Sequence, residues 1–276
     1  MKLSCFYGSQ GRSKKDVVQE LARKDLIEFF KNTDEPYHMK QIQVLFEGKR
    51  PEGRPEVQYF HWVTDRAVKQ LIDEGFLRKI VEKGKYYDVI FVLRSDVRYF
   101  KRSIKERIKL IDQYSSPDVT EGLGDYAEEL FLIALELNDF EAIGRETNEY
   151  MGRKWTETDH DLDYIVERDD IVYGAEVKNT LGYIEAEDFD VLLDICDYLG
   201  VKPLCIFRFA PKTKINEIRR RGGFAWIFKT QIYPPGNRTL VNAIYNTMGL
   251  PLQIWKRVPD STVKRFLDWH ERQIEK

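Results

Sequence analysis

Two acidic residues and a lysine occupy strand-like positions in the second half of the chain. Residues 172–180 read VYGAEVKNT, and a strand there would place Glu176 and Lys178 on one face, because alternate side chains of a strand share a face. The preceding segment reads TDHDLDYIVERDD, and a second strand there would place Asp161 and Asp163 on one face. If ERDD joins the two strands as a hairpin, Asp163 comes close to Glu176 and Lys178.

This set of side chains is suited to phosphodiester hydrolysis. Hard divalent cations bind oxygen ligands, so Asp163 and Glu176 could hold such an ion together with the Val177 carbonyl. A metal ion at that place would polarise a phosphate and acidify a bound water, and the neighbouring lysine would stabilise the developing negative charge. Upstream, the segment GLGDYAEEL supplies Glu128 and Glu129 on a predicted helix.

A surface ion pair is the ordinary alternative for an E-x-K tripeptide, because glutamate and lysine are common residues. In that interpretation Glu176 and Lys178 face water on a half-exposed strand. Ala175, Val177 and Val172 would face the core. The occurrence of an aspartate, a glutamate and a lysine on two adjacent predicted strands favours a functional site over this alternative.

The order of these residues resembles the PD-(D/E)xK nuclease superfamily, whose pattern is a helical glutamate, an aspartate on one strand and E-x-K on the next. The resemblance spans about residues 121–230, and the pattern around Glu128 looks most like that of archaeal Holliday-junction resolvases and some restriction endonucleases. It implies Mg²⁺-dependent cleavage of nucleic acid, with Mn²⁺ as a substitute. It also implies Asp163 and Glu176 as metal ligands, Lys178 near the nucleophile, and Glu128 as an accessory ligand.

Several details of this pattern stay open. The proline that names the family is absent, because Leu162 precedes Asp163. The family-like G-x-x-x-E spacing favours Glu128, but Glu129 is the alternative, and both acids could simply face solvent near a helix start. Asp161 could replace or assist Asp163.

The segments around these residues alternate between helical and strand-like patterns. Their order predicts an α/β domain with a mixed β-sheet flanked by helices, which in the resemblance is a restriction-endonuclease-like core. Two further helices are expected near 239–247 and 261–275, and Ser261 could cap the second. The other predicted elements are a helix at 123–137, strands at 140–147, 161–167 and 171–178, a helix at 185–199, a strand at 203–209, a helix at 212–221 and a strand at 224–230.

The first half of the chain has a different pattern, which predicts a small α+β domain. Apolar spacing indicates helices at 16–30, 39–46 and 63–74. The run FLRKIVEKGKYYDVIFVLR then indicates two strands around a Lys-Gly turn. Three helices followed by a β-hairpin resemble the winged helix-turn-helix family over about 80 residues, through element order rather than a sharp motif.

That second resemblance implies contact with DNA through a recognition helix at 63–74 and the tip of the hairpin. The outer face of the helix would carry residues that can reach base edges or phosphates: Thr64, Arg66, Lys69 and Gln70. The tip would carry Lys83 and Lys85, which suit contacts with the DNA backbone. Domains of this kind also bind proteins or dimerise, so DNA binding is one of two interpretations.

A basic helix is predicted between the two halves, at 96–114, and SSP at 115–117 ends it. The expected domains are therefore a winged-helix domain at 1–95, a connecting helix at 96–117, and a nuclease domain with a C-terminal helical appendage at 118–276. The span 94–109 holds seven basic and two acidic residues, a net charge of +5. Such a run either follows a phosphate backbone or forms a solvated helix face, and the same two interpretations apply to Arg219, Arg220 and Arg221.

Composition describes an ordinary globular chain, with 276 residues, 42% hydrophobic, 33% charged and a net charge of −2. It has no run of 18 uncharged apolar residues, so no membrane span is expected, and MKLSCFYGSQGRSKKD lacks the apolar run of a signal peptide. A cytoplasmic location follows, with Cys5, Cys196 and Cys205 as buried or idle thiols. The scattered histidines argue against a zinc site.

Together these features predict an enzyme, a metal-dependent endonuclease that cuts duplex DNA in restriction, other defence or repair. A homodimer is expected only because many members of the family cut two strands in that form. Two alternatives remain. One is a DNA-binding regulator whose nuclease-like domain is a scaffold, against which the intact Asp/Glu/Lys set argues. The other is an RNA-cutting nuclease of the same superfamily, for which no RNA-specific motif is visible.

Overall fold

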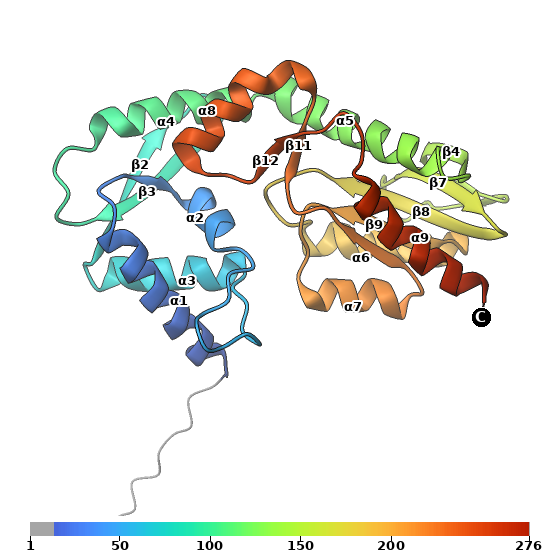
Figure 1. Ribbon diagram of the computed structural model, residues 1–276, viewed down its shortest axis with the longest axis horizontal. Coiled ribbons are helices and arrows are strands. Elements are labelled where there is room, and N and C mark those ends of the chain that lie inside the picture. The colour runs from blue at the N-terminus through green and yellow to red at the C-terminus, as the bar shows by residue number, and fades with distance from the viewer. Residues whose placement is uncertain (1–13, 276) are drawn as a thin grey trace, which may run out of the picture. The chain divides into compact units, whose positions relative to one another are not determined.

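The protein divides into two compact units, and the division lies between Asp112 and Gln113. The structure is a computed structural model that describes residues 14–275, with side chains from residue 17 onward. Cys5 and the N-terminal segment that was compared with a signal peptide lie outside the described residues. Figure 1 shows the elements of both units.

The first unit combines α-helices with a small antiparallel sheet (Figure 1). The predicted helices and hairpin are present, and α4 starts later than residue 96. The strand β1 was missed because it is only two residues long, and the sheet order is β1-β3-β2. The elements are α1 (Lys14–Lys31), β1 (Tyr37–His38), α2 (Met39–Phe46), α3 (His61–Asp73), β2 (Leu77–Lys83), β3 (Asp88–Arg94) and α4 (Lys101–Tyr114).

One apolar core holds the first unit together. Helix α1 contributes Ala22, Leu26 and Phe30, which recur every four residues and therefore lie on one helix face. Helix α3 adds Ala67, Val68 and Leu71, and each of these six side chains is fully buried. The spacing of the apolar residues in the sequence is thus what turns these helices toward a common centre.

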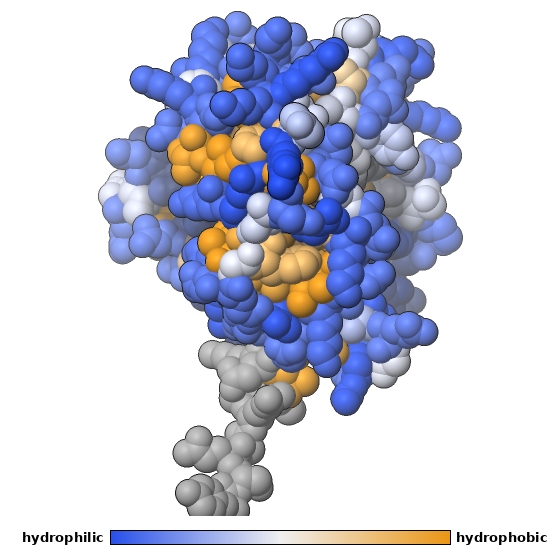
Figure 2. Space-filling model, turned by 90° about the vertical axis from the view of Figure 1, so that its left-hand side faces the viewer, coloured by the Kyte–Doolittle hydropathy of each residue, from blue (hydrophilic) through white to orange (hydrophobic). Residues whose placement is uncertain are grey.

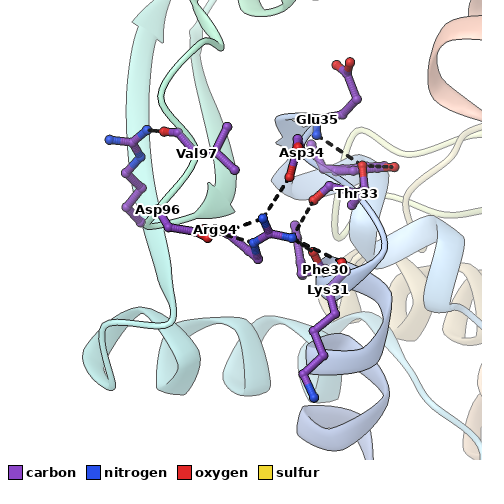
Figure 3. Close-up of polar contacts among 10 residues, drawn as sticks. Phe30, Lys31, Thr33, Asp34, Glu35, Arg94, Asp96 and Val97 are labelled. Carbon is purple, nitrogen blue, oxygen red and sulfur yellow. Dashed lines mark hydrogen bonds and ion pairs between the residues drawn. The ribbon is translucent and has the colours of Figure 1, made fainter.

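Arg94 closes the end of α1 (Figure 3). Its guanidinium donates to the carbonyl oxygens of Phe30 and Lys31 at 3.1 and 3.2 Å and to Asp34 Oδ1 at 2.8 Å. Carbonyls at a helix end have no partner within the helix, so this side chain satisfies them. The first basic residue of the 94–109 span therefore serves the fold.

The second unit contains a five-stranded mixed sheet with helices on its faces, as predicted. The sheet order is β10-β9-β8-β7-β4; β8, β9 and β10 run parallel, and β7 is antiparallel to both β8 and β4. The elements are α5 (Pro117–Glu136), β4 (Glu141–Thr147), β5 (Glu149–Tyr150), β6 (Arg153–Lys154), β7 (Leu162–Arg168), β8 (Ile171–Lys178), α6 (Ala186–Leu199), β9 (Lys202–Phe207), α7 (Lys212–Arg220), β10 (Phe224–Ile227), β11 (Gln231–Tyr233), η1 (Pro235–Asn237), α8 (Arg238–Met248), β12 (Leu252–Ile254) and α9 (Asp260–Ile274).

Separate apolar clusters cover the two faces of this sheet. Ala175 and Val177 of β8 lie in the cluster that includes Phe131 of α5 and Phe266 of α9. The other cluster lies under α6 and α7. Val172 packs against it, so the prediction that Val172 shares a face with Val177 was wrong. Residues 172 and 176 are an even number apart and therefore share the α6 side.

Two predicted helix starts were also wrong. Helix α5 begins at Pro117 rather than at residue 123, because proline is well suited to the first turn, where its missing N–H costs nothing. Helix α9 begins at Asp260, directly after Pro259. Ser261 therefore lies inside the first turn and does not cap the helix.

The described residues show a polar exterior and buried thiols. Figure 2 shows a face that is mainly hydrophilic, with apolar residues gathered in two areas of it. Among the described helices, none has both the length and the apolar character needed to cross a bilayer. Cys196 and Cys205 are buried and make no disulfide.

Candidate functional site

The predicted hairpin is present, and its open end carries the acidic residues. Strands β7 and β8 pair from Arg168 opposite Ile171 to Tyr164 opposite Ala175. Beyond that pair the Val177 N–H donates to Asp163 Oδ2 at 2.6 Å. The carboxylate of Asp163 thus takes the place of a backbone acceptor where the two strands separate. In an extended strand the N–H and C=O of a residue point to the same neighbour, so the Val177 carbonyl is directed to the same side.

Glu176 and Lys178 form an ion pair between Oε1 and Nζ, and both lie on the α6 side of the sheet. An ion pair between these two residues was also expected if they formed only a surface salt bridge, but the burial of Glu176 differs from that expectation. Glu176 is only 8% exposed, whereas a surface pair leaves both groups in water. Lys178 keeps 39% of its side chain exposed, so the pair is half-buried, and the desolvation of Glu176 offsets part of the Coulomb attraction.

Glu128, rather than Glu129, belongs with these residues. Glu128 is half-buried on α5, and the charges of Glu176 and Lys178 both act on its carboxyl. Glu129 is exposed, and its Oε2 lies 3.6 Å from Nη1 of Arg145 on β4. The geometry therefore groups Glu128 with Asp163, Glu176 and Lys178, which come from three different elements.

The carboxyl groups of this cluster are held in an environment that favours their neutral forms. Burial raises the pKa of Asp163 to about 8, and the charges of Glu176 and Glu128 add to this effect. The Val177 N–H and Lys178 act against it. Burial also raises the pKa of Glu176, and burial followed by the charge of Asp125 raises the pKa of Glu128.

Lys178 responds in the opposite sense to the same surroundings. Burial by itself would lower the pKa of Lys178, but the carboxylates of Glu176, Asp163 and Glu128 outweigh burial and raise it. The ammonium group therefore stays charged beside the carboxyl groups. The three carboxyl groups favour their neutral forms beside a single ammonium group, and a bound cation would stabilise their charged forms.

The oxygen donors fit a hard divalent cation in their chemistry. Among the described residues, however, no three His, Cys, Asp or Glu side chains are arranged around a common point as metal ligands. Asp163 Oδ2 accepts from Val177 and Glu176 Oε1 faces Lys178. Asp163 Oδ1 and Glu176 Oε2 take no part in these contacts, so each carboxylate keeps an oxygen that can face a cation.

A small cavity opens beside Glu176 and Lys178, and two of its polar residues were not singled out from the sequence. It has a volume of about 200 Å³, and His160 and Asp188 line it together with Asp161. His160 Nε2 lies 3.5 Å from Asp188 Oδ1, across a loop and the first turn of α6. No local pattern links these two residues, because only the approach of α6 to the sheet brings them together.

Asp161 was predicted to lie in a strand with Asp163, and that placement was wrong. It precedes β7 and is exposed, because the strand begins at Leu162. Asp161 nevertheless faces the cavity beside Glu176 and Lys178. Asp161 thus lies near the site from a loop position and not from a strand. Its role in assisting Asp163 stays a prediction.

Asn179 is a positioning residue that sequence reasoning missed. Its Nδ2 donates to the carbonyl of Leu123 on α5 at 2.9 Å and to the carbonyl of Ile232 at 2.8 Å, and its Oδ1 accepts from Ile232 N–H at 2.8 Å. The side chain is buried. It therefore ties the end of β8, which carries Glu176 and Lys178, to the helix that carries Glu128. An asparagine directly after a strand normally reads as a turn residue, so the sequence offered no signal for this role.

The residues predicted to contact DNA do not all lie on the surface. Thr64 is fully buried in the core of the first unit, so its predicted place on the outer face of α3 was wrong. It lies between Val63 and Ala67, both buried, and belongs to the inward half of the helix. Gln70 is half-buried and bonds to Gln19 on α1.

The remaining predicted residues are exposed. Arg66 and Lys69 lie on the outer face of α3, where Lys69 Nζ is 2.7 Å from Asp65 Oδ2. Lys83 ends β2, and Lys85 lies in the turn that follows it. All four side chains are thus exposed, as the prediction requires.

The chain was compared with known protein families, curated proteins and solved structures. No protein-family model, no curated protein and no solved structure shows a significant match to the chain.

Proposed function

We propose that this protein is a metal-dependent endonuclease that hydrolyses phosphodiester bonds of DNA. The observation that carries the proposal is the convergence of Glu128, Asp163, Glu176 and Lys178 from α5, β7 and β8 at the open end of one hairpin. Titratable groups whose pKa values are shifted by burial and by specific charged partners cluster at functional sites.

The order of elements supports the same proposal. The five-stranded sheet and its helices follow the order α5, β4, β7, β8, α6 and β9, with the short pair β5 and β6 between β4 and β7. This agrees with the restriction-endonuclease-like core that the PD-(D/E)xK resemblance implies. The first unit runs α1, β1, α2, α3, β2, β3, and its sheet order β1-β3-β2 suits a winged helix.

Each residue of the cluster has a distinct task in this proposal. Asp163 and Glu176 would hold Mg²⁺ or Mn²⁺ together with the Val177 carbonyl, and Glu128 would assist them. The ion, when bound, would polarise the phosphate and lower the pKa of a water. Lys178, which lies beside Glu176, would stabilise negative charge on the phosphate.

The first unit would position the duplex in this proposal. Arg66 and Lys69 on α3 and Lys83 and Lys85 at the hairpin are exposed cations of the types that contact bases and phosphates. The cytoplasmic location, the homodimer and a role in restriction, defence or repair belong to the proposal as expectations from the sequence.

A cleavage assay tests the proposal. Supercoiled plasmid, linear duplex, single strands, a branched junction and RNA would each be incubated with Mg²⁺, Mn²⁺ or EDTA. We expect cutting that needs the metal and that Asp163→Ala and Lys178→Ala reduce by more than about a hundredfold. Asp190→Ala and Lys256→Ala are matched controls, because both residues are exposed in the same unit.

The result also separates the alternatives. Cutting in EDTA, or equal cutting by the site variants and their controls, would contradict the proposed site. Binding of duplex without cutting under any of these conditions would leave a DNA-binding regulator. A strong preference for RNA would support the alternative that the protein is an RNA-cutting nuclease of the same superfamily.

A further inference from the structure

A row of lysines lies along the exposed face of α4. Lys101, Lys105 and Lys109 follow one another at intervals of four, so they share one face of the helix. All three are exposed, whereas the opposite face buries Ile104 and Ile111. Within the described part of the chain, none of their ammonium groups has a carboxylate at ion-pair distance. We call these three residues the α4 ridge.

Three arginines of the same span have partners within the described residues. Arg107 is buried, and its Nη1 lies 2.8 Å from Glu35 Oε2. Arg102 pairs with Glu106 at 3.0 Å along the helix. Arg94 closes the end of α1, as Figure 3 shows. The tertiary structure thus gives Arg94, Arg102 and Arg107 partners, whereas Arg98 and the ridge lysines are exposed and have no carboxylate at ion-pair distance among the described residues.

The hairpin turn of β2 and β3 is anchored at the end of the ridge. Asp112 continues the same helix face, three residues after Lys109, and its Oδ1 accepts from the backbone N–H of Lys85 at 2.8 Å. Gly84 lies so close that a Cβ there would come within 3.0 Å of the same carboxylate. The turn that carries Lys83 and Lys85 is therefore fixed against the last turn of α4.

We infer that the α4 ridge binds the phosphate backbone of duplex DNA, as a surface separate from the outer face of α3. Each step of four residues rises about 6 Å along the helix, so the ridge presents its charges over about 12 Å. A duplex carries several phosphates over that length. Lysine acts as a point charge that suits phosphates and does not read bases, so the ridge would add affinity without sequence preference.

This inference goes beyond the proposed nuclease and does not require that the protein cut DNA. Its partner follows from charge complementarity, because the ridge lysines are unpaired and the acid at the end of the row is already engaged by the hairpin turn. An anionic lipid surface is the other polyanion that such a row could meet. The experiment therefore includes vesicles as a separate arm.

Salt-dependent binding tests the inference in the full-length protein. The triple variant Lys101→Gln, Lys105→Gln, Lys109→Gln would be compared with wild type on a labelled duplex in EDTA, where no metal-dependent cutting occurs. The slope of log affinity against log salt should become shallower by about 0.9 for each lysine lost, or about 2.7 in total. The triple Lys→Arg variant should keep the wild-type slope.

A second triple variant controls for net charge. Lys24→Gln, Lys31→Gln and Lys212→Gln also removes three exposed lysines, from α1 and α7. Its slope should stay close to that of wild type. Circular dichroism and thermal melting would show that all variants are folded, and the exposed positions give no reason for loss of stability.

Three results would overturn the inference. The ridge variant could keep the wild-type slope, the control variant could lose as much slope as the ridge variant, or wild type could fail to bind duplex. Loss of binding confined to phosphatidylserine vesicles would also count against it. If the ridge variant has the wild-type salt slope and the protein cuts DNA, the ridge inference is contradicted and the nuclease proposal stands. If the ridge variant has a shallower slope but the protein never cuts DNA, the nuclease proposal is contradicted and the ridge inference stands.

Discussion

Asp163 is a carboxyl group held where its neutral form is favoured. It is surrounded by the like charges of Glu176 and Glu128, and a single N–H bond from Val177 and the nearby Lys178 oppose them. A structural ion pair has no need of three acidic groups around one lysine. At the scale of single residues, the site therefore stores electrostatic free energy that a bound cation would release.

Replacing Asp163 with asparagine should stabilise the protein in the absence of metal. Asparagine keeps an acceptor for the Val177 N–H and removes the charge. The folded-state pKa of about 8 exceeds the ordinary value of 3.8, so the folded state holds an extra proton between these values. Wild-type stability should fall as pH rises through that window, by on the order of 1–4 kcal/mol, and the variant should lack this fall.

Urea unfolding in EDTA between about pH 4 and about pH 8 measures this difference. Asp190→Asn is the matched control, since it removes an exposed carboxylate from the same unit. The electrostatic account fails if Asp163→Asn shows the pH dependence of wild type, or if it is less stable than wild type near neutral pH.

At the scale of elements, Asn179 joins three parts of the second unit. Its hydrogen bonds connect the end of β8 to α5 and to β11. The relative position of Glu128 and Glu176 depends on this link, because the two residues lie on α5 and β8. The side chain is buried and its bonds go to backbone groups of the protein, so we regard Asn179 as a positioning residue.

Asn179→Ala should cost about 2–4 kcal/mol of unfolding free energy, because it removes three buried hydrogen bonds and leaves the N–H and C=O of Ile232 without the partner that Asn179 supplies. If the variant stays folded, it should also need more Mg²⁺ for half-maximal cutting, because Glu128 and Glu176 would no longer be held in register. Urea unfolding and a Mg²⁺ titration of the cleavage rate measure the two effects.

Asn216→Ala on the exposed side of α7 provides the control for both measurements. Asn179→Asp tests the role more finely, since it keeps the shape and the acceptor but loses both donors. An unchanged Mg²⁺ requirement in folded Asn179 variants would mean that the asparagine supports the fold without positioning the site.

At the scale of the whole molecule, the two units have separate cores. The cluster of the first unit runs from Ala22 to Val92, and the two clusters of the second begin at Ala127 and Trp155. No described residue belongs to more than one of these clusters. Each unit thus buries its own apolar surface, which is the physical requirement for folding as an independent domain.

The segment 115–276 should therefore fold when it is produced alone, and it should keep metal-dependent cutting at low salt. It lacks the exposed cations of α3, the hairpin and α4, so its affinity for duplex should be weaker and its cutting should disappear at lower salt than that of the full chain. Thermal melting and a salt series of the cleavage assay measure this. A fragment that folds and cuts as salt-resistantly as the full chain would remove the first unit from DNA binding.

The sequence by itself determined most elements and the pairing of the hairpin. Apolar residues at helical or alternating spacing reflect which face of a local segment meets the core, and this information is local. The same alternation placed Glu176 and Lys178 on one face, and the short connection brought Asp163 to them. Element ends were less well determined, as Pro117 and Asp260 show, because a helix start depends on its first turn rather than on periodicity.

Only the tertiary structure decided which polar residues are free to act. Thr64 proved to be buried, and Glu128 was separated from Glu129 by the packing of α5 on the sheet. His160 and Asn179 lie near the site in the sequence, but their partners, Asp188 for the first and Leu123 and Ile232 for the second, come from distant elements. The basic span divided into structural Arg94 and Arg107 and the unpaired lysines of α4. Burial and partnership depend on contacts between distant segments, so no local pattern could reveal them.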